Sequence, residues 1–319
     1  MSIAGEYKII YQKEMAEAAG EILCSYRPVF KTYEFRPMRH NCGICGGSCC
    51  TEDCGKGLGG LMRRNLVFYC YGEEEIVEGV KNGRFCDLEN AALYAYKKRL
   101  PKRAALQDGL PGEVLLDLLI QTDEPEAYKL AVRTLFRQDD NNEIKGFDLT
   151  YFSIRQGKIS LWLGQAKMGT KGYCRGGIDA DLMKLEKEYL SRQIYFVADK
   201  PVGITEEAKK IVEAINDLNM RNIRKSNTVQ AEELLKHFRE KDISIKIPCL
   251  LAYGTDGVYE DIKQVEQHIA KEIEGAQKYF AQKKYIFEGF TPEILFYVLP
   301  LKDLKKLRSD EGFYYGLRE

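Results

Sequence analysis

Three side chains in one short segment, Asp148, Gln165 and Lys167, have the chemistry needed to bind a metal ion and act on a phosphate ester. Carboxylate and amide oxygens are ligands for hard divalent cations. An ammonium group can contact an attacking water and offset the charge that develops on phosphorus. This combination is that of a D…(E/Q)xK nuclease site. Because the pattern is short, an ordinary amphipathic hairpin with polar ends is the alternative interpretation.

A β-hairpin would bring these side chains together. Residues 146–167 read GFDLTYFSIRQGKISLWLGQAK and alternate between apolar and polar on both sides of the glycine at 157. A two-residue loop at 156–157 sets the register and places Asp148 directly opposite Gln165, with Lys167 as the diagonal neighbour. A three-residue loop would shift the register by one and separate the side chains.

A helix is predicted just before the hairpin, in the segment PGEVLLDLLIQT, with Pro111 in its first turn. Glu113 and Asp117 lie four residues apart and share one face of this helix. Glu113 is a candidate for an additional metal or water contact. The alternative is a carboxylate that only stabilises the helix N-terminus, where acidic residues are favoured.

A cysteine cluster is the other candidate metal site. Five of the ten cysteines lie within thirteen residues, at Cys42, Cys45, Cys49, Cys50 and Cys54. We expect Cys42, Cys45, Cys49 and Cys54 to bind Zn²⁺ or an iron-sulfur cluster in a structural role, with reduced thiols as the alternative. The glycines around them predict a loop and exclude a long helix or strand.

The overall charge gives no signal for nucleic acid, because 48 basic and 48 acidic residues balance in 319. Any DNA contact must therefore be local. Lys171 and Arg175 lie in a glycine-rich segment that we expect to be a flexible link, and Lys187 lies in the helix predicted after it. These three are candidate DNA-binding residues, and ordinary solvated charge is the alternative.

The remaining patterns predict a chain that mixes helices and strands. A cluster of proline, glycine and basic residues near position 105 suggests an N-terminal module, 1–104, with the cysteine-rich loop, and a catalytic domain, 105–319. Strands are expected at the start of 64–80, in 243–254 and near 294–301. Helices are expected in 11–24, 88–100, 203–219, 228–240 and 258–284.

We expect no membrane association and a cytoplasmic location. No apolar run approaches the ~20 residues needed to cross a bilayer. The N-terminal residues also lack the basic-then-apolar order of a secretory signal.

The motifs GFDLTYF, LWLGQAKM and GEVLLDLLI resemble those of the HamA family, the nuclease subunits of the bacterial Hachiman anti-phage defence system. The resemblance covers about residues 105–300 and omits the cysteine cluster. It implies a restriction-endonuclease-like α/β (α+β) fold of the PD-(D/E)xK superfamily, with a mixed central sheet flanked by helices. It also implies Mg²⁺- or Mn²⁺-dependent, largely non-specific DNA cleavage. The implied partner is a HamB-like superfamily 2 helicase, which restrains the nuclease until activation.

Carried over by position, the resemblance makes Asp148 the metal-binding aspartate, Lys167 the catalytic lysine and Glu113 the helical acid. The Ala166 carbonyl is a further candidate metal ligand. Gln165 departs from the family, which usually has glutamate there, and an uncharged amide holds Mg²⁺ less strongly. It is a native variant, a glutamate-to-glutamine change made to silence a toxic nuclease, or a naturally weakened site. The alternative function is therefore a catalytically weak subunit that binds DNA or regulates the helicase.

Overall fold

A computed structural model of the chain describes residues 3–24, 27–30, 33–40, 53–100, 109–132, 146–199, 206–255 and 257–318. The predicted ligands Cys42, Cys45 and Cys49 lie outside these ranges. Cys54 lies in a helix, but its side chain is also outside the described part.

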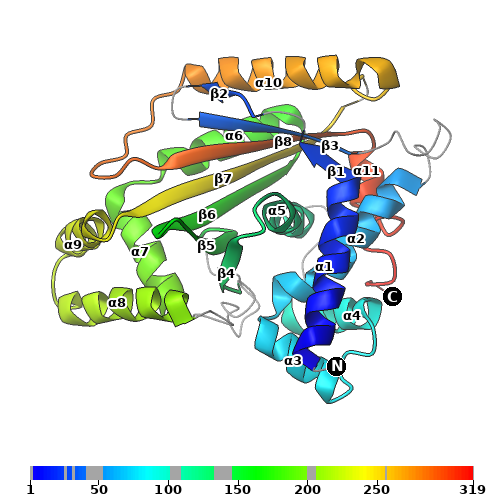
Figure 1. The fold of residues 1–319 in the computed structure, drawn as a ribbon. Coiled ribbons are helices and arrows are strands. Elements are labelled where there is room, and N and C mark those ends of the chain that lie inside the picture. Colours follow the sequence, from blue (N-terminus) through cyan, green and yellow to red (C-terminus); the bar gives the residue numbers. More distant parts are fainter. Residues whose placement is uncertain are drawn as a thin grey trace.

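A mixed sheet of eight described strands forms the centre of the fold (Figure 1). Its strands are β1 (Ile22–Cys24), β2 (Val29–Phe30), β3 (Tyr33–His40), β4 (Ala127–Ala131), β5 (Leu149–Arg155), β6 (Lys158–Gly169), β7 (Ile243–Gly254) and β8 (Glu293–Leu301). The order is β1-β3-β8-β7-β6-β5-β4, with β2 paired to β3. Strands β3, β8, β7 and β6 run parallel, and the other pairings are antiparallel. This confirms the predicted α/β class and mixed central sheet.

Helices cover both faces of the sheet, and a separate apolar core lies on each face. Helices α1 (Ile3–Glu21), α2 (Asp53–Cys70), α3 (Glu73–Lys81), α4 (Leu88–Arg99) and α5 (Leu110–Asp123) contribute to the first core. Helices α6 (Lys171–Met183), α7 (Lys187–Ala198), α8 (Glu206–Asn222), α9 (Asn227–Glu240) and α10 (Val265–Ala281) contribute to the second. Figure 1 shows α5 and α10 on opposite sides of the strands.

The hairpin register agrees with the two-residue loop. Arg155 pairs with Lys158, and the ladder continues to Leu149 opposite Gly164. Gln156 and Gly157 have φ angles of 50° and 77°. Two central residues with positive φ are typical of the type I′ turn, whose twist matches that of the flanking strands.

The glycine-rich segment after the cysteine cluster is helical, contrary to the prediction. Helix α2 includes the glycines and continues through the residues expected to begin a strand at position 64. A Cβ on Gly59 would lie 2.7 Å from the carbonyl carbon of Gly312. Glycine therefore serves close packing between α2 and the C-terminal segment. Burial of Leu58, Met62 and Leu66 on the same helix favours the helix despite the low propensity of glycine.

The expected flexible link after the hairpin is also helical. The hydroxyl of Thr170 accepts a hydrogen bond from the Tyr173 amide (3.3 Å) and caps α6. Cys174 and Ile178 are fully buried on its inner face. The link and the single helix predicted after it are therefore two helices, α6 and α7.

Helix α5 has the predicted proline in its first turn and lies almost wholly in the interior. Asp117 is fully buried and accepts hydrogen bonds from Asn65 (3.0 Å) and Gln121 (2.6 Å), and Lys129 lies 3.0 Å away. Its role is to hold α5 against α2 and β4. The boundary predicted near residue 105 stays a prediction, and β3 from before it joins the same sheet as β8 from after it.

Candidate active site

A cavity of about 490 Å³ lies where α5 and α6 meet the end of β6. Helix α11 (Leu304–Leu307) ends beside it. The described residues that line the cavity are Gly109, Glu113, Asp148, Ala166, Lys167, Met168, Gly169, Thr170, Tyr173 and Arg308. The structure thus brings three of the four predicted catalytic residues to one site.

Asp148 directly precedes β5, at the point where the pairing of β5 with β6 ends. Its Oδ2 atom accepts a hydrogen bond of 2.7 Å from the Ala166 amide, and its own amide donates to the Gly164 carbonyl (2.9 Å). A residue in a strand directs its N–H and C=O groups to the same edge. The Ala166 carbonyl is therefore directed towards the Asp148 carboxylate, and two oxygen donors meet at this edge.

Gln165 is placed beside this site but not on the cavity wall. Its side chain shares a face of β6 with Lys167, since alternate strand residues point the same way. It is buried (8% exposed), and it is not among the described residues that line the cavity. The geometry brings Asp148, Ala166 and Lys167 to the cavity wall and leaves Gln165 off it among the described residues.

Glu113 reaches the cavity from the opposite face of the sheet, in the first turn of α5. The helix comes close to β6 at Gly112, where a Cβ would lie 3.2 Å from the Cβ of Met168. The Glu113 side chain is buried, and Tyr69 of α2 donates a hydrogen bond of 2.6 Å to its Oε2 atom. Tyr69 therefore fixes the orientation of this carboxylate.

Lys167 is paired with Asp181, an acid of α6. The Nζ and Oδ2 atoms lie 2.6 Å apart, and both side chains are 21% exposed. Burial acts to lower the pKa of Lys167, but the hydrogen bond and charge of Asp181 and the charge of Asp148 outweigh it, so the pKa is raised. Lys167 is therefore held as the ammonium ion.

Sequence reasoning missed Asp181 because the segment before it was taken as a flexible link. The signal was available as an acid eleven residues after Thr170, the polar residue that caps α6. A helix starting at that cap places Gly177 and Asp181, four residues apart, on one face. A Cβ on Gly177 would lie 2.9 Å from the Cε of Lys167, so this glycine makes room for the lysine.

The three predicted DNA-binding residues do not line the cavity among the described residues. Lys171 lies 2.8 Å from a carboxylate oxygen of Glu272 on α10. The Arg175 guanidinium is 6.0 Å from the centre of the Tyr279 ring on the same helix. Lys187 lies 3.3 Å from a carboxylate oxygen on α9. DNA binding by these residues stays a prediction.

A family model described as HamA matches residues 49–315, which is most of the chain and includes the whole cavity lining. The chain belongs to the HamA family. A comparison with curated proteins finds no match. Membership of the HamA family indicates a protein related to Hachiman defence.

Within the described ranges, no helix has the length and apolar character to cross a membrane.

The donor set of this HamA-family site fits a hard divalent cation. Asp148 and Glu113 supply carboxylates to the cavity, and Ala166 supplies a main-chain oxygen. Mg²⁺ is commonly bound by one or two carboxylates and keeps several waters. The described residues hold no cluster of three or more His, Cys, Asp or Glu side chains suited to a metal. Zn²⁺ or an iron-sulfur cluster at the predicted cysteines stays a prediction.

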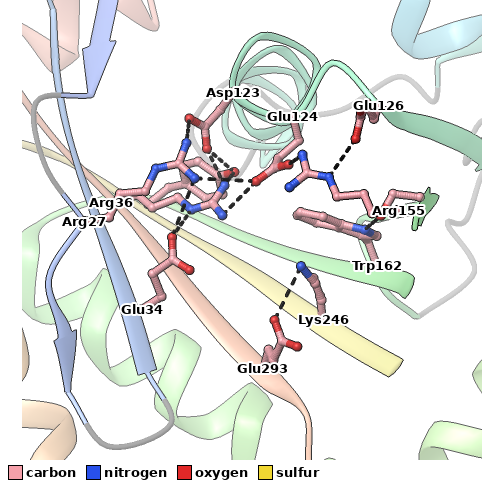
Figure 2. Close-up of polar contacts among 12 residues, drawn as sticks. Arg27, Glu34, Arg36, Asp123, Glu124, Glu126, Arg155, Trp162, Lys246 and Glu293 are labelled. Atoms are coloured by element: carbon pink, nitrogen blue, oxygen red, sulfur yellow. Dashed lines mark hydrogen bonds and ion pairs between the residues drawn. The ribbon is translucent and has the colours of Figure 1, made fainter. Parts of the chain in front are cut away.

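A second charged cluster in this HamA-family chain lies at the other end of α5 (Figure 2). Arg36 of β3, with its side chain 3% exposed, contacts Asp123 and lies 2.9 Å from Glu124 and 2.8 Å from Glu34. Burial acts to lower the pKa of Arg36, and the surrounding hydroxyl and carboxylates outweigh it, so the pKa is raised. The buried guanidinium of Arg36 and the carboxylates around it therefore pair with one another. This cluster anchors the C-terminal end of the helix whose first turn lines the cavity.

Proposed function

We propose that this chain is a metal-dependent DNA endonuclease that acts as the effector of a two-component Hachiman-type defence system. The observation that carries the proposal is the convergence of Asp148, Glu113 and Lys167 on one cavity at an open strand edge. Two carboxylates beside an ammonium group match the requirements of phosphodiester hydrolysis. Membership of the HamA family supports the same reaction.

Each residue has a role that follows from its position. Asp148, Glu113 and the Ala166 carbonyl would hold the cation. A bound Mg²⁺ or Mn²⁺ supplies Lewis-acid polarisation of the phosphate and a more acidic bound water. Lys167, held as an ammonium ion, offsets the charge of the pentacovalent transition state and orients the attacking water. The raised pKa of Lys167 favours this electrostatic role over that of a general base.

Cleavage should be largely independent of DNA sequence. The sequence has no net charge and no motif that resembles a module for reading base edges, so we expect binding to rest on local contacts to phosphate. Such contacts release counterions, which makes binding fall steeply with salt. A superfamily 2 helicase is the proposed partner that restrains the nuclease until it engages DNA. Adding the helicase should therefore suppress cleavage by the isolated chain.

Cleavage of supercoiled plasmid by the isolated chain tests the proposal. Wild-type protein should nick or degrade the plasmid with Mg²⁺ or Mn²⁺ and not with EDTA. Lys167→Ala and Asp148→Asn should each lose this activity. Lys158→Ala is the matched control, because Lys158 lies at the other end of the same strand and its side chain is 73% exposed. Metal-dependent cleavage that persists in Lys167→Ala would show that the assignment is wrong.

A second candidate function is a catalytically weak subunit that binds DNA or regulates the helicase. Gln165 favours it, because an uncharged amide stands at the position where the family usually has a glutamate. Gln165→Glu separates the two functions. A gain in cleavage of about tenfold or more would identify the present chain as a weakened enzyme, and an unchanged rate would favour a site that works without this side chain.

A further inference from the structure

The cavity wall includes two residues, Tyr173 and Arg308, that the proposed catalytic chemistry does not use. They come from different parts of the chain, the first turn of α6 and the residue that follows α11. Both are held in place by their surroundings. Tyr173 contributes an exposed aromatic ring to the cavity wall, and Arg308 contributes a guanidinium group.

Tyr173 is fixed although its ring is exposed. Its amide is capped by Thr170, and its ring lies against Gly169 at the end of β6. A Cβ on Gly169 would lie 2.8 Å from the Cδ1 atom of the ring. The side chain nevertheless stays 59% exposed. An exposed ring that lies against backbone and lines a cavity can serve as a platform on which a flat ligand stacks.

The backbone of Arg308 is fixed by the packing of the C-terminal segment. Its amide donates to the Leu304 carbonyl (3.1 Å), and Leu307 beside it is buried. The close contact of Gly59 with Gly312 holds the same segment against α2. Burial raises the pKa of the Cys174 thiol to about 12, although the charges of Lys167 and Arg308 both act to lower it. The charges of Lys167 and Arg308 therefore both act on the buried thiol of Cys174.

The charges of the cavity explain why a second cation is needed. Glu113 and Asp148 repel a phosphodiester, and the charge of Lys167 is partly offset by Asp181. Arg308 supplies positive charge on the same wall, and a guanidinium suits phosphate because it can donate two parallel hydrogen bonds.

We propose that Tyr173 and Arg308 form a nucleotide subsite beside the reacting phosphate, in which an unpaired base stacks on Tyr173 and a neighbouring phosphate pairs with Arg308. This inference rests on the proposed function for its choice of DNA as ligand. A base inside a duplex has both faces covered by its neighbours, so the platform selects a single-stranded or locally opened strand. The substrate class is therefore DNA with an unpaired base, either a single strand or a duplex that is locally opened.

Fluorescence anisotropy in EDTA tests the subsite without turnover. The full chain is titrated against a labelled single-stranded oligonucleotide and against a duplex of the same sequence. Tyr173→Ala should weaken single-strand binding about tenfold and leave duplex binding unchanged, because one stacked base is lost. Tyr173→Phe keeps the ring and should bind like wild type. Tyr128→Ala is the control, since Tyr128 is a comparably exposed aromatic (51%) on β4 that does not line the cavity among the described residues.

The salt dependence of the same binding tests Arg308. Arg308→Gln should reduce the slope of log K against log salt by about 0.7 for the single strand, the value for one phosphate contact. Arg221→Gln, an exposed arginine of α8 away from the cavity lining, should leave the slope unchanged. Melting temperatures of all variants establish that they are folded.

The outcomes separate this inference from the proposed function. Equal losses on single strand and duplex in Tyr173→Ala, an unchanged slope in Arg308→Gln, or no single-strand binding by wild type would each overturn the subsite. Single-strand binding that depends on Tyr173 and Arg308 supports it even if the plasmid assay shows no cleavage. Metal-dependent cleavage with binding indifferent to Tyr173 would leave the nuclease proposal standing and remove the subsite alone.

Discussion

The ammonium nitrogen of Lys167 lies 2.6 Å from the carboxylate of Asp181, which joins the end of β6 to α6 at the wall of the cavity. The pair fixes both the position and the charge of the lysine. A phosphate that enters the cavity must share this ammonium group with Asp181. The acid is therefore a positioning residue for Lys167, and its removal should alter the chemistry of the lysine more than the fold.

Asp181→Asn should lower the pKa of Lys167, because burial still acts to lower it while the main opposing charge is gone. Single-turnover cleavage measured from neutral to alkaline pH should show the alkaline loss of activity at lower pH than in wild type. Asp181→Glu keeps the charge and should restore the wild-type profile in part. Identical profiles for wild type and Asp181→Asn would rule out this role.

The same pair has a consequence for stability. The folded-state pKa of Lys167 is raised, so its contribution to stability is fully present below the unfolded pKa and is lost as pH rises through the folded value. The difference in unfolding free energy between wild type and Asp181→Asn should therefore be constant at neutral pH and disappear at strongly alkaline pH. Urea unfolding across this range measures it.

Gly177→Ala should reduce cleavage with little loss of stability. The added Cβ would lie 2.9 Å from the Cε atom of Lys167, and a flexible side chain moves more easily than a helix. A displacement of about 1 Å at a reacting group can lower a rate by up to about a hundredfold. Gly176→Ala is the matched control, because nothing lies within 4 Å of a Cβ there. It should keep activity and gain about 0.5–1 kcal/mol in stability.

Tyr69→Phe should impair the site through Glu113. The change removes the 2.6 Å hydrogen bond to a buried carboxylate, worth about 1.5–3 kcal/mol. Cleavage should need more Mg²⁺ to reach half its maximal rate, since the carboxylate is no longer held in one orientation. In the control, Tyr71→Phe, the lost hydroxyl is buried without a hydrogen-bond partner among the described residues. A Mg²⁺ requirement that is unchanged in Tyr69→Phe would contradict the assigned role.

Arg36→Ala should destabilise the protein by about 3–5 kcal/mol, because it removes the one buried cation among the described residues that contacts both buried carboxylates, Asp123 and Glu124. Arg155→Ala removes another partner of the same Glu124, but the Arg155 side chain is 50% exposed and the loss should be below about 1 kcal/mol. Urea unfolding followed by circular dichroism compares the two. Equal losses would mean that burial of Arg36 contributes little to the energy of the cluster.

The sequence was sufficient for the hairpin and for the placement of Asp148 and Lys167. The register depends on a two-residue loop and on period-two alternation, which are local properties of residues 146–167. The start of α5, with Pro111 in its first turn, and the strand β7 were likewise predictable from local patterns. These elements are specified by interactions between near neighbours in the chain, so no knowledge of the remaining fold was needed.

Tertiary packing decided the rest. Helix propensity argued against α2 and the start of α6, because their glycines weaken an isolated helix. Burial of apolar residues on both helices favours them, and the close contacts at Gly59 and Gly177 explain why glycine stands there. Asp181 and Arg308 come from separate segments that no local pattern links to the hairpin. The sequence alone therefore determined which residues carry the proposed chemistry, and the packing of helices on both faces of the sheet determined what surrounds them, because those contacts join residues far apart in the chain.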